Sequence, residues 1–177
     1  GLDFDNVSFV GIMNADNMMN FPDFRAHERS YQMMSQVSGR AGRSDKRGKV
    51  IIQTYNPDHF IIRCIIDQNY LEMYQNQVLE RMNFKYPPFY RIIEMLVKHR
   101  DSGVLDKAAA ELAQSLRSRF GSRVLGPEYP MVGRIRNEYL KKIMIKLEKG
   151  MALKESKNII NNTIASLRAE PSYKQLR

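Results

Sequence analysis

Residues 36–55 read QVSGRAGRSDKRGKVIIQTY, a stretch that joins the end of a predicted helix to a predicted strand. Its first eight residues fit the pattern Q-x-x-G-R-x-x-R, in which Arg40 and Arg43 lie one turn apart beside two glycines. Arginine presents a planar, permanently charged fork of donors that suits phosphate oxygens. The same residues also fit a helix C-terminus, with Gly39 as the cap and basic side chains near the helix dipole. From the octet alone, both interpretations stay open.

The flanking sequence predicts a βαβ unit. The apolar run at 7–13, VSFVGIM, predicts a buried strand of the kind found in parallel sheets. A helix is predicted over 24–38 with Asp23 as its N-cap. A second strand, KVIIQTY at 49–55, is ended by Asn56-Pro57. The crossover between two such strands should be right-handed, and ligands should gather beyond the carboxyl ends of the strands.

Metal and cysteine chemistry find little support in the sequence. Asp16 follows the first strand and is a weak candidate for a magnesium-binding carboxylate, because no G-x-x-x-x-G-K-[ST] phosphate loop accompanies it. The single cysteine, Cys64, excludes a disulfide framework and a cysteine zinc site, and we expect it to be a small buried hydrophobe in a reducing cytoplasm. His27, His59 and His99 show no metal-ligand spacing, so we expect no metal site in this chain.

Composition and charge favour a polyanionic partner. The chain has 177 residues, of which 43% are hydrophobic, enough for one good core or two small ones. Residues 1–66 carry 8 Lys/Arg against 7 Asp/Glu, whereas residues 67–177 carry 20 against 12. A basic second half favours nucleic acid through counterion release. No apolar stretch has transmembrane length and no signal peptide opens the chain, and because residue 1 is glycine we expect a piece of a longer protein.

The second half of the chain predicts a separate α+β domain. An amphipathic connecting helix is expected over 67–85, with Leu71, Tyr74, Val78 and Met82 as its apolar positions. The break Tyr86-Pro87-Pro88-Phe89 marks the domain boundary. Beyond it the pattern predicts, in order, a strand, a helix, two strands and a helix, at 91–99, 104–120, 123–132, 139–148 and 152–167. This β-α-β-β-α order lacks the closing strand of a split βαβ sandwich.

Two groups of residues in this half are candidates for nucleic-acid contact. Arg134, Arg136, Lys141 and Lys142 cluster around a predicted hairpin, and they fit either a DNA contact or a solvated hairpin edge guarded by positive charge. The aromatic residues of 86–90 fit base stacking, but aromatics beside a Pro-Pro break also pin a linker onto a core.

Several strings resemble known helicase motifs. Gly1-Leu2-Asp3-Phe4 before an apolar strand resembles motif V of superfamily 2 helicases, and the octet at 36–43 resembles motif VI, which holds the arginine fingers. The strings at 1–16, 22–43 and 48–59, together with the Tyr86–Arg91 break, resemble the replication-restart helicase family of primosomal protein N′. The resemblance covers essentially the whole chain. It departs at Ser44-Asp45, and at Leu140, where arginine tends to follow the tyrosine.

This resemblance implies an α/β chain with three parts. Residues 1–66 would be the C-terminal part of the second, RecA-like (P-loop class) helicase lobe, and 67–85 the connecting helix. Residues 86–177 would be a ferredoxin-like domain, similar to small-subunit ribosomal protein S-ten, lacking its last strand.

The resemblance also implies roles for single residues. Arg40 and Arg43 would contact the γ-phosphate of ATP held by an absent first lobe. Gln36 and Gly39 would help to order the phosphate site, while Gly1 and Asp3 would link it to the DNA strand being moved. ATP and magnesium are therefore the expected cofactors, and zinc is expected in the full-length protein but not in this chain.

The expected function follows from the same resemblance. It is that of an ATP-dependent 3′-to-5′ DNA helicase that restarts stalled replication forks, with this piece alone inactive. Forked and single-stranded DNA, single-stranded DNA-binding protein and primosome proteins would be its partners, in the cytoplasm and not at a membrane. The alternatives are a non-enzymatic nucleic-acid-binding or assembly module and another superfamily 2 translocase.

Overall fold

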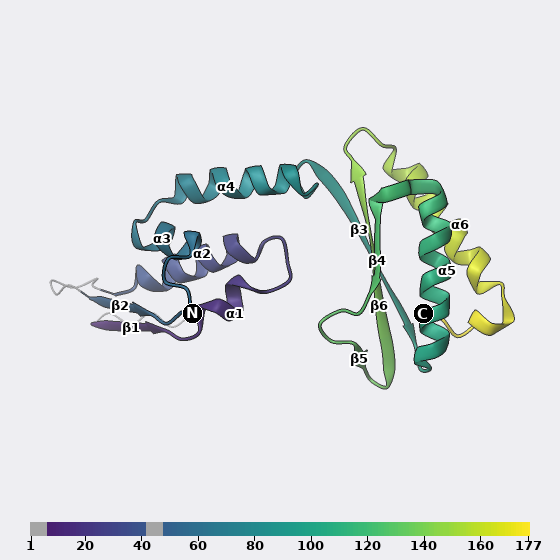
Figure 1. Ribbon diagram of the computed structural model, residues 1–177, viewed down its shortest axis with the longest axis horizontal. Coiled ribbons are helices and arrows are strands. Elements are labelled where there is room, and N and C mark those ends of the chain that lie inside the picture. Colours follow the sequence, from purple (N-terminus) through teal and green to yellow (C-terminus); the bar gives the residue numbers. More distant parts are fainter. Residues whose placement is uncertain (1–6, 42–47) are drawn as a thin grey trace. The chain divides into compact units, whose positions relative to one another are not determined.

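The computed structural model describes residues 7–41 and 48–177. The chain divides into two compact units, Gly1–Phe84 and Lys85–Arg177, each with its own set of helices and strands (Figure 1). Gly1, Asp3 and Arg43, which the sequence singles out, lie outside the described residues.

The first unit contains a parallel pair of strands joined through helices. β1 (Phe9–Ile12) pairs in parallel with β2 (Lys49–Ile52), so that Phe9 lies opposite Lys49. The short helix α1 (Ala15–Met19) and the longer α2 (Ala26–Ser38) connect them. The strand–helix–strand order is the predicted one, although both strands are shorter than the apolar runs at 7–13 and 49–55.

The prediction that Asp23 caps α2 is wrong. The helix begins at Ala26, and Arg25 occupies the N-cap position without a side-chain bond. The Asp23 carboxylate accepts a hydrogen bond from the N–H of Arg25 at 2.8 Å. The backbone carbonyl of Asp23 accepts one from the N–H of Ala26 at 2.9 Å. Asp23 therefore stabilises the turn that precedes the helix, because its side chain bonds a donor too early in the chain to belong to the first helical turn.

The core of the first unit lies between the strands and three helices. After β2 come α3 (Phe60–Ile66) and α4 (Tyr70–Asn83), and both pack against α2. The predicted burial of Cys64 is confirmed, since the residue is 2% exposed. His59 caps α3, because its ring nitrogen Nδ1 accepts the N–H of Ile61 at 3.2 Å. Among the described residues, the buried core of this unit consists of Ile12, Ala15, Met19, Tyr31, Met34, Ile61, Ile62, Cys64, Ile65 and Met73.

Helix α4 buries residues other than its apolar stripe. Met73 and Gln77 are its buried residues, whereas Leu71 is 63% exposed and Tyr74 is 50% exposed. The predicted apolar positions therefore lie mainly on the outer side of the helix. Polar contacts help to hold the inner side, where the Arg81 guanidinium pairs with the Glu28 carboxylate of α2.

The second unit is an antiparallel sheet with two long helices. Its elements are β3 (Tyr90–His99), α5 (Ser102–Phe120), β4 (Val124–Glu128), β5 (Arg134–Ile135), β6 (Glu138–Glu148) and α6 (Leu153–Arg168). The strand order is β3-β6-β4, and the short β5 pairs with the beginning of β6. The predicted β-α-β-β-α order is thus present, with β5 added.

Both helices of this unit cover the same face of its sheet (Figure 1). Alternation along β6 sends Ile143, Ile145 and Leu147 into the core beneath them, while Lys142 and Lys146 lie on the opposite face. The core also takes up the apolar side of α5, including Leu105, Leu112 and Leu116.

The edge of β3 opposite β6 meets the end of the chain. No strand follows α6 in the described residues 169–177, which contain a single short 3-10 turn, Pro171–Tyr173. Lys98 and Arg177 nevertheless exchange two backbone hydrogen bonds, at 2.8 and 3.1 Å. Tyr173 and Leu176 are buried in the core, so the tail is held against the unit by packing as well.

Candidate nucleotide and nucleic-acid sites

The end of α2 carries the described part of the arginine octet. The Gly39 N–H bonds the Ser35 carbonyl at 2.9 Å, and the Arg40 N–H bonds the Val37 carbonyl at 3.1 Å, so the chain keeps turning past Ser38. Gly39 occupies the C-cap position, as its sequence context indicates, but its φ of −66° is right-handed. A left-handed cap therefore does not explain this glycine.

Buried residues of α2 fix where this end lies. Tyr31 is 7% exposed and Met34 is 1% exposed, and both belong to the core of the unit. Gln36 is exposed and Arg40 is partly buried at the end of the same helix. The structure thus brings Gln36, Gly39 and Arg40 together within about one turn, while Arg43, Gly1 and Asp3 lie outside the described residues.

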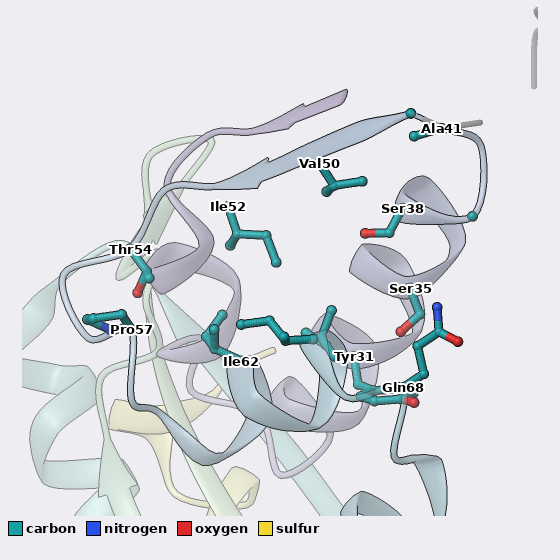
Figure 2. Close-up of a pocket in the computed structure, with 14 residues that line it drawn as sticks. Tyr31, Ser35, Ser38, Ala41, Val50, Ile52, Thr54, Pro57, Ile62 and Gln68 are labelled. Carbon is teal, nitrogen blue, oxygen red and sulfur yellow. The ribbon is translucent and has the colours of Figure 1, made fainter. Parts of the chain in front are cut away.

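A cavity of about 610 Å³ lies beside this helix end. Figure 2 shows Val50 and Ile52 of β2 on one wall, with Tyr31, Ser35 and Ser38 of α2 facing them. Ala41 and Ile62 complete part of the lining, and none of the described residues around the cavity is charged. The described lining therefore offers no cation to a phosphate, while residues 42–47, which follow Ala41, lie outside the described residues.

Asp16 makes a structural bond between two elements of the first unit. Its carboxylate accepts the Thr54 hydroxyl at 2.8 Å and the Tyr55 N–H at 3.0 Å, which joins α1 to the end of β2. Burial raises the pKa of Asp16, but these two bonds outweigh it and leave the pKa below its ordinary value. Both oxygens are thereby engaged. Among residues 7–41 and 48–177 no three His, Cys, Asp or Glu side chains form a group able to hold a metal ion.

The predicted hairpin of the second unit is formed by β5 and β6 and carries two arginines. Arg134 lies opposite Tyr139 across β5 and β6, and the turn between the strands consists of Arg136 and Asn137. Both turn residues have positive φ, 48° and 65°, as a two-residue type I′ turn requires. The Arg134 guanidinium lies 4.8 Å from the centre of the Tyr139 ring and hydrogen-bonds the Asn137 side chain. Both arginines are exposed.

The two lysines next to the hairpin are engaged within the unit. The Lys141 ammonium lies 3.1 Å from the Asp106 carboxylate and 3.6 Å from the centre of the Tyr129 ring. The Tyr129 hydroxyl donates to the same carboxylate at 3.0 Å. Only 13% of the Lys141 side chain is exposed. Its charge is therefore directed toward α5.

Lys142 lies on the opposite face of the sheet and pairs with Glu128 at 2.9 Å. This hydrogen bond holds the pKa of Lys142 above its ordinary value. Sequence reasoning missed Asp106, Tyr129 and Glu128, because no local spacing connects these partners to the lysines. The structure thus separates the predicted basic cluster into two exposed arginines and two carboxylate-paired lysines.

The aromatic residues at the start of the second unit, Tyr86, Phe89 and Tyr90, are partly buried. The Tyr86 carbonyl accepts the N–H groups of Phe89 and Tyr90, at 3.1 and 3.2 Å. The Lys146 ammonium lies 3.6 Å from the centre of the Tyr86 ring, and burial together with the charge of Lys85 lowers the pKa of Lys146. Because Lys146 lies on the face of the sheet opposite the helices, this contact holds Tyr86 against the sheet of its own unit.

Comparison with known proteins adds a family to this geometry. No helix in the described part of the chain has the length and apolar content needed to cross a membrane. The chain is 38% identical over 148 residues to the replication restart protein PriA of Bacillus subtilis strain 168, which covers 82% of the chain and 18% of the relative. It is 34% identical over 149 residues to that of a Synechocystis strain, covering 82% and 18%. It is 31% identical over 165 residues to that of Borreliella burgdorferi, covering 92% and 24%.

The chain thus spans about a fifth of the length of the curated relatives it matches. The family model of the primosomal protein N C-terminal domain matches residues 82–176, which include the whole antiparallel sheet, the hairpin and both covering helices. The chain therefore belongs to the family of the primosomal protein N C-terminal domain.

Proposed function

We propose that this chain is part of an ATP-dependent 3′-to-5′ DNA helicase that restarts stalled replication forks. The observation that carries the proposal is the match to replication restart proteins over most of the chain, 82% of it in the relative from Bacillus subtilis. Forked and single-stranded DNA would be its substrates. Single-stranded DNA-binding protein and primosome proteins would be its partners, in the cytoplasm.

In this proposal the first unit belongs to the second RecA-like lobe of the helicase. The parallel β1–β2 pair, with helices crossing between the strands, supports that assignment. The guanidinium groups of Arg40 and Arg43 would meet the γ-phosphate oxygens of ATP as charge shifts during hydrolysis. Gln36 and Gly39 would order this side of the cleft, and Gly1 and Asp3 would connect it to the DNA strand.

The residues described around the end of α2 bear on which groups could bind phosphate and metal ions there. The C-terminal end of α2 presents carbonyl groups, which repel an anion, so any attraction for phosphate must come from the arginine side chains. No described group of residues fits Mg²⁺ or Zn²⁺. We propose that parts of the longer protein outside this chain hold both ions and the rest of the nucleotide.

The second unit would be a ferredoxin-like domain that contacts DNA. Its strand order β4-β6-β3 and the Lys98–Arg177 pairing at the outer edge of β3 support this fold, because the closing strand of a split βαβ sandwich lies at that edge. Arg134 and Arg136 would be its phosphate contacts, whereas Lys141 and Lys142 are engaged by carboxylates.

The arginine assignment is tested by Arg40→Ala and Arg43→Ala in the full-length protein. Each change should lower DNA-stimulated ATP hydrolysis by about 10³–10⁵-fold, the loss typical of an arginine finger, while DNA binding is retained. Arg63→Ala, which removes an exposed arginine of α3, is the matched control and should leave hydrolysis unchanged. ATPase rates within a few-fold of wild type in both variants would show that neither arginine is a finger.

The non-enzymatic alternative has a different signature. An assembly or DNA-binding module predicts a full-length protein that binds DNA without hydrolysing ATP in its presence. Steady-state ATPase measurement with and without forked DNA separates the two functions.

A further inference from the structure

The segment between β4 and β6 combines exposed apolar side chains with the two exposed arginines of the hairpin. Met131 is 70% exposed, Val132 is 59% exposed and Ile135 is 49% exposed. Arg134 and Arg136 lie in the same nine-residue stretch, YPMVGRIRN at 129–137, which contains no acidic residue. In Figure 1 the β4–β5 connection and β5 lie on the side of the sheet away from α5 and α6.

Contacts at the base of this segment hold it in place. The Gly133 carbonyl accepts the N–H of Leu140 at 2.9 Å, and Leu140 is 1% exposed. On the other side Tyr129 is tied to Asp106 of α5 through its hydroxyl and lies beneath the Lys141 ammonium. The apolar side chains at 131, 132 and 135 therefore stay exposed on a braced hairpin, because the polar contacts of its base fix the backbone that carries them.

The exposed charges of the segment are positive, which favours a polyanion as its ligand. Lys141 and Lys142 are neutralised by Asp106 and Glu128, so they add little to the field at the hairpin. The arginines of the tip are exposed, and Arg134 contacts the neutral side chains of Tyr139 and Asn137. The exposed segment is thus positively charged and apolar at once.

We propose that the hairpin segment 129–137 binds the junction between double- and single-stranded DNA. Met131, Val132 and Ile135 contact base faces that are uncovered at the junction, while Arg134 and Arg136 hold the flanking phosphates. This inference rests on the proposed function, which makes DNA the substrate of the chain. In continuous duplex the base faces are stacked on each other, so apolar side chains gain contact area only where stacking is interrupted.

The test measures binding of the 177-residue chain to three labelled DNAs: a fork, a duplex and a single strand. The double variant Met131→Ser, Val132→Ser should weaken fork binding about 10-fold, in the range of one lost base–side-chain contact, and change duplex binding less than about twofold. Arg136→Gln should weaken binding to all three DNAs and lower the slope of log affinity against log salt by about one.

Two controls keep the result interpretable. Leu71→Ser removes an equally exposed apolar side chain from α4 and should leave all three affinities unchanged. Ile135→Ser repeats the apolar test at a second position of the hairpin. Circular dichroism and thermal unfolding should match wild type for every variant, because about half or more of each apolar side chain is exposed.

The outcomes distinguish the inference from the function on which it rests. A wild-type chain that binds none of the three DNAs overturns the DNA role itself, and the junction site with it. A wild-type chain that binds DNA while the Met131 and Val132 variant keeps its fork preference overturns the junction site alone.

Discussion

At the scale of single residues, Gly126 is a position of the second unit where a side chain cannot be added without strain. Its φ of +89° is rarely adopted by residues with a side chain. A Cβ added there would lie 2.6 Å from the Lys142 carbonyl oxygen, which belongs to the backbone of the central strand β6. Strand β6 pairs on both sides and cannot move aside without breaking ladder hydrogen bonds.

We therefore expect Gly126→Ala to destabilise the chain by about 1–3 kcal/mol, the usual cost of strained backbone at one residue. Gly150→Ala is the control, because a Cβ there meets no atom within 4 Å. Urea unfolding followed by circular dichroism measures both. Equal midpoints for the two variants would contradict the strain at Gly126.

His59 makes the first unit sensitive to acid. Burial lowers the pKa of His59 below its ordinary value of 6.5, and the neighbouring His27 acts in the same direction, while Asp16 and Glu80 oppose them. The rings of His27 and His59 are 5.3 Å apart, so protonation of both would place two positive charges together. The unfolded chain therefore binds the proton of His59 more readily than the folded chain does.

This sign predicts that the His59 contribution to stability is fully present above pH 6.5 and is lost as the pH falls from there through the folded pKa. His59→Asn should flatten that dependence, because asparagine keeps an N-cap acceptor for α3 and does not titrate. The measurement is the free energy of unfolding at pH 7.5 and below pH 6. A variant whose stability falls with pH as steeply as wild type would exclude His59 as the origin.

At the scale of elements, α4 shows that hydrophobic pattern and burial are separate properties. Met73 is 1% exposed and belongs to the core with α2 and α3, whereas Leu71, two residues earlier, is 63% exposed. The inner side of the helix is otherwise polar, with Gln77 buried and Arg81 paired to Glu28. The contacts with α2, rather than the apolar stripe, determine which side faces inward.

We expect Met73→Ala to cost about 2–5 kcal/mol of unfolding free energy, the range for truncating a buried methionine. Leu71→Ala on the same helix should cost no more than about 0.5 kcal/mol, because its side chain is mostly in water. Chemical denaturation of both variants decides the matter. A larger loss for Leu71→Ala than for Met73→Ala would mean that the outer stripe of α4 is the buried one.

At the scale of the whole molecule, the arginine octet belongs to only part of an enzyme in our proposal. The chain spans about a fifth of the length of its relatives, and in our proposal the rest of the nucleotide site lies outside it. We therefore expect the isolated chain to show no DNA-stimulated ATP hydrolysis above background. A phosphate-release assay with forked DNA tests this, and stimulated turnover by the purified chain would contradict it.

Much of the second unit was predictable from local pattern. A strand is predicted at 139–148 and observed at 138–148, and a helix is predicted at 152–167 and observed at 153–168. Alternating apolar residues in one and a 3.6-residue repeat in the other specify these elements without reference to the rest of the chain. The start of α2 was not predictable in this way, because the Asp23 carboxylate accepts from the Arg25 N–H and from the Arg29 guanidinium, and local pattern does not distinguish these contacts from a helix cap.

By itself, the sequence determined the order of the longer elements, though not α1, α3 or β5, together with the basic excess of the second half and the spacing of Arg40 and Arg43, since all three are properties of neighbouring residues. Only the tertiary structure decided which charges are available. Asp106 and Glu128 lie 35 and 14 residues from the lysines that they neutralise, and the sheet and α5 bring them within 3.1 and 2.9 Å. Long-range packing places such partners, so it separated the exposed arginines of the hairpin from the paired lysines beside them.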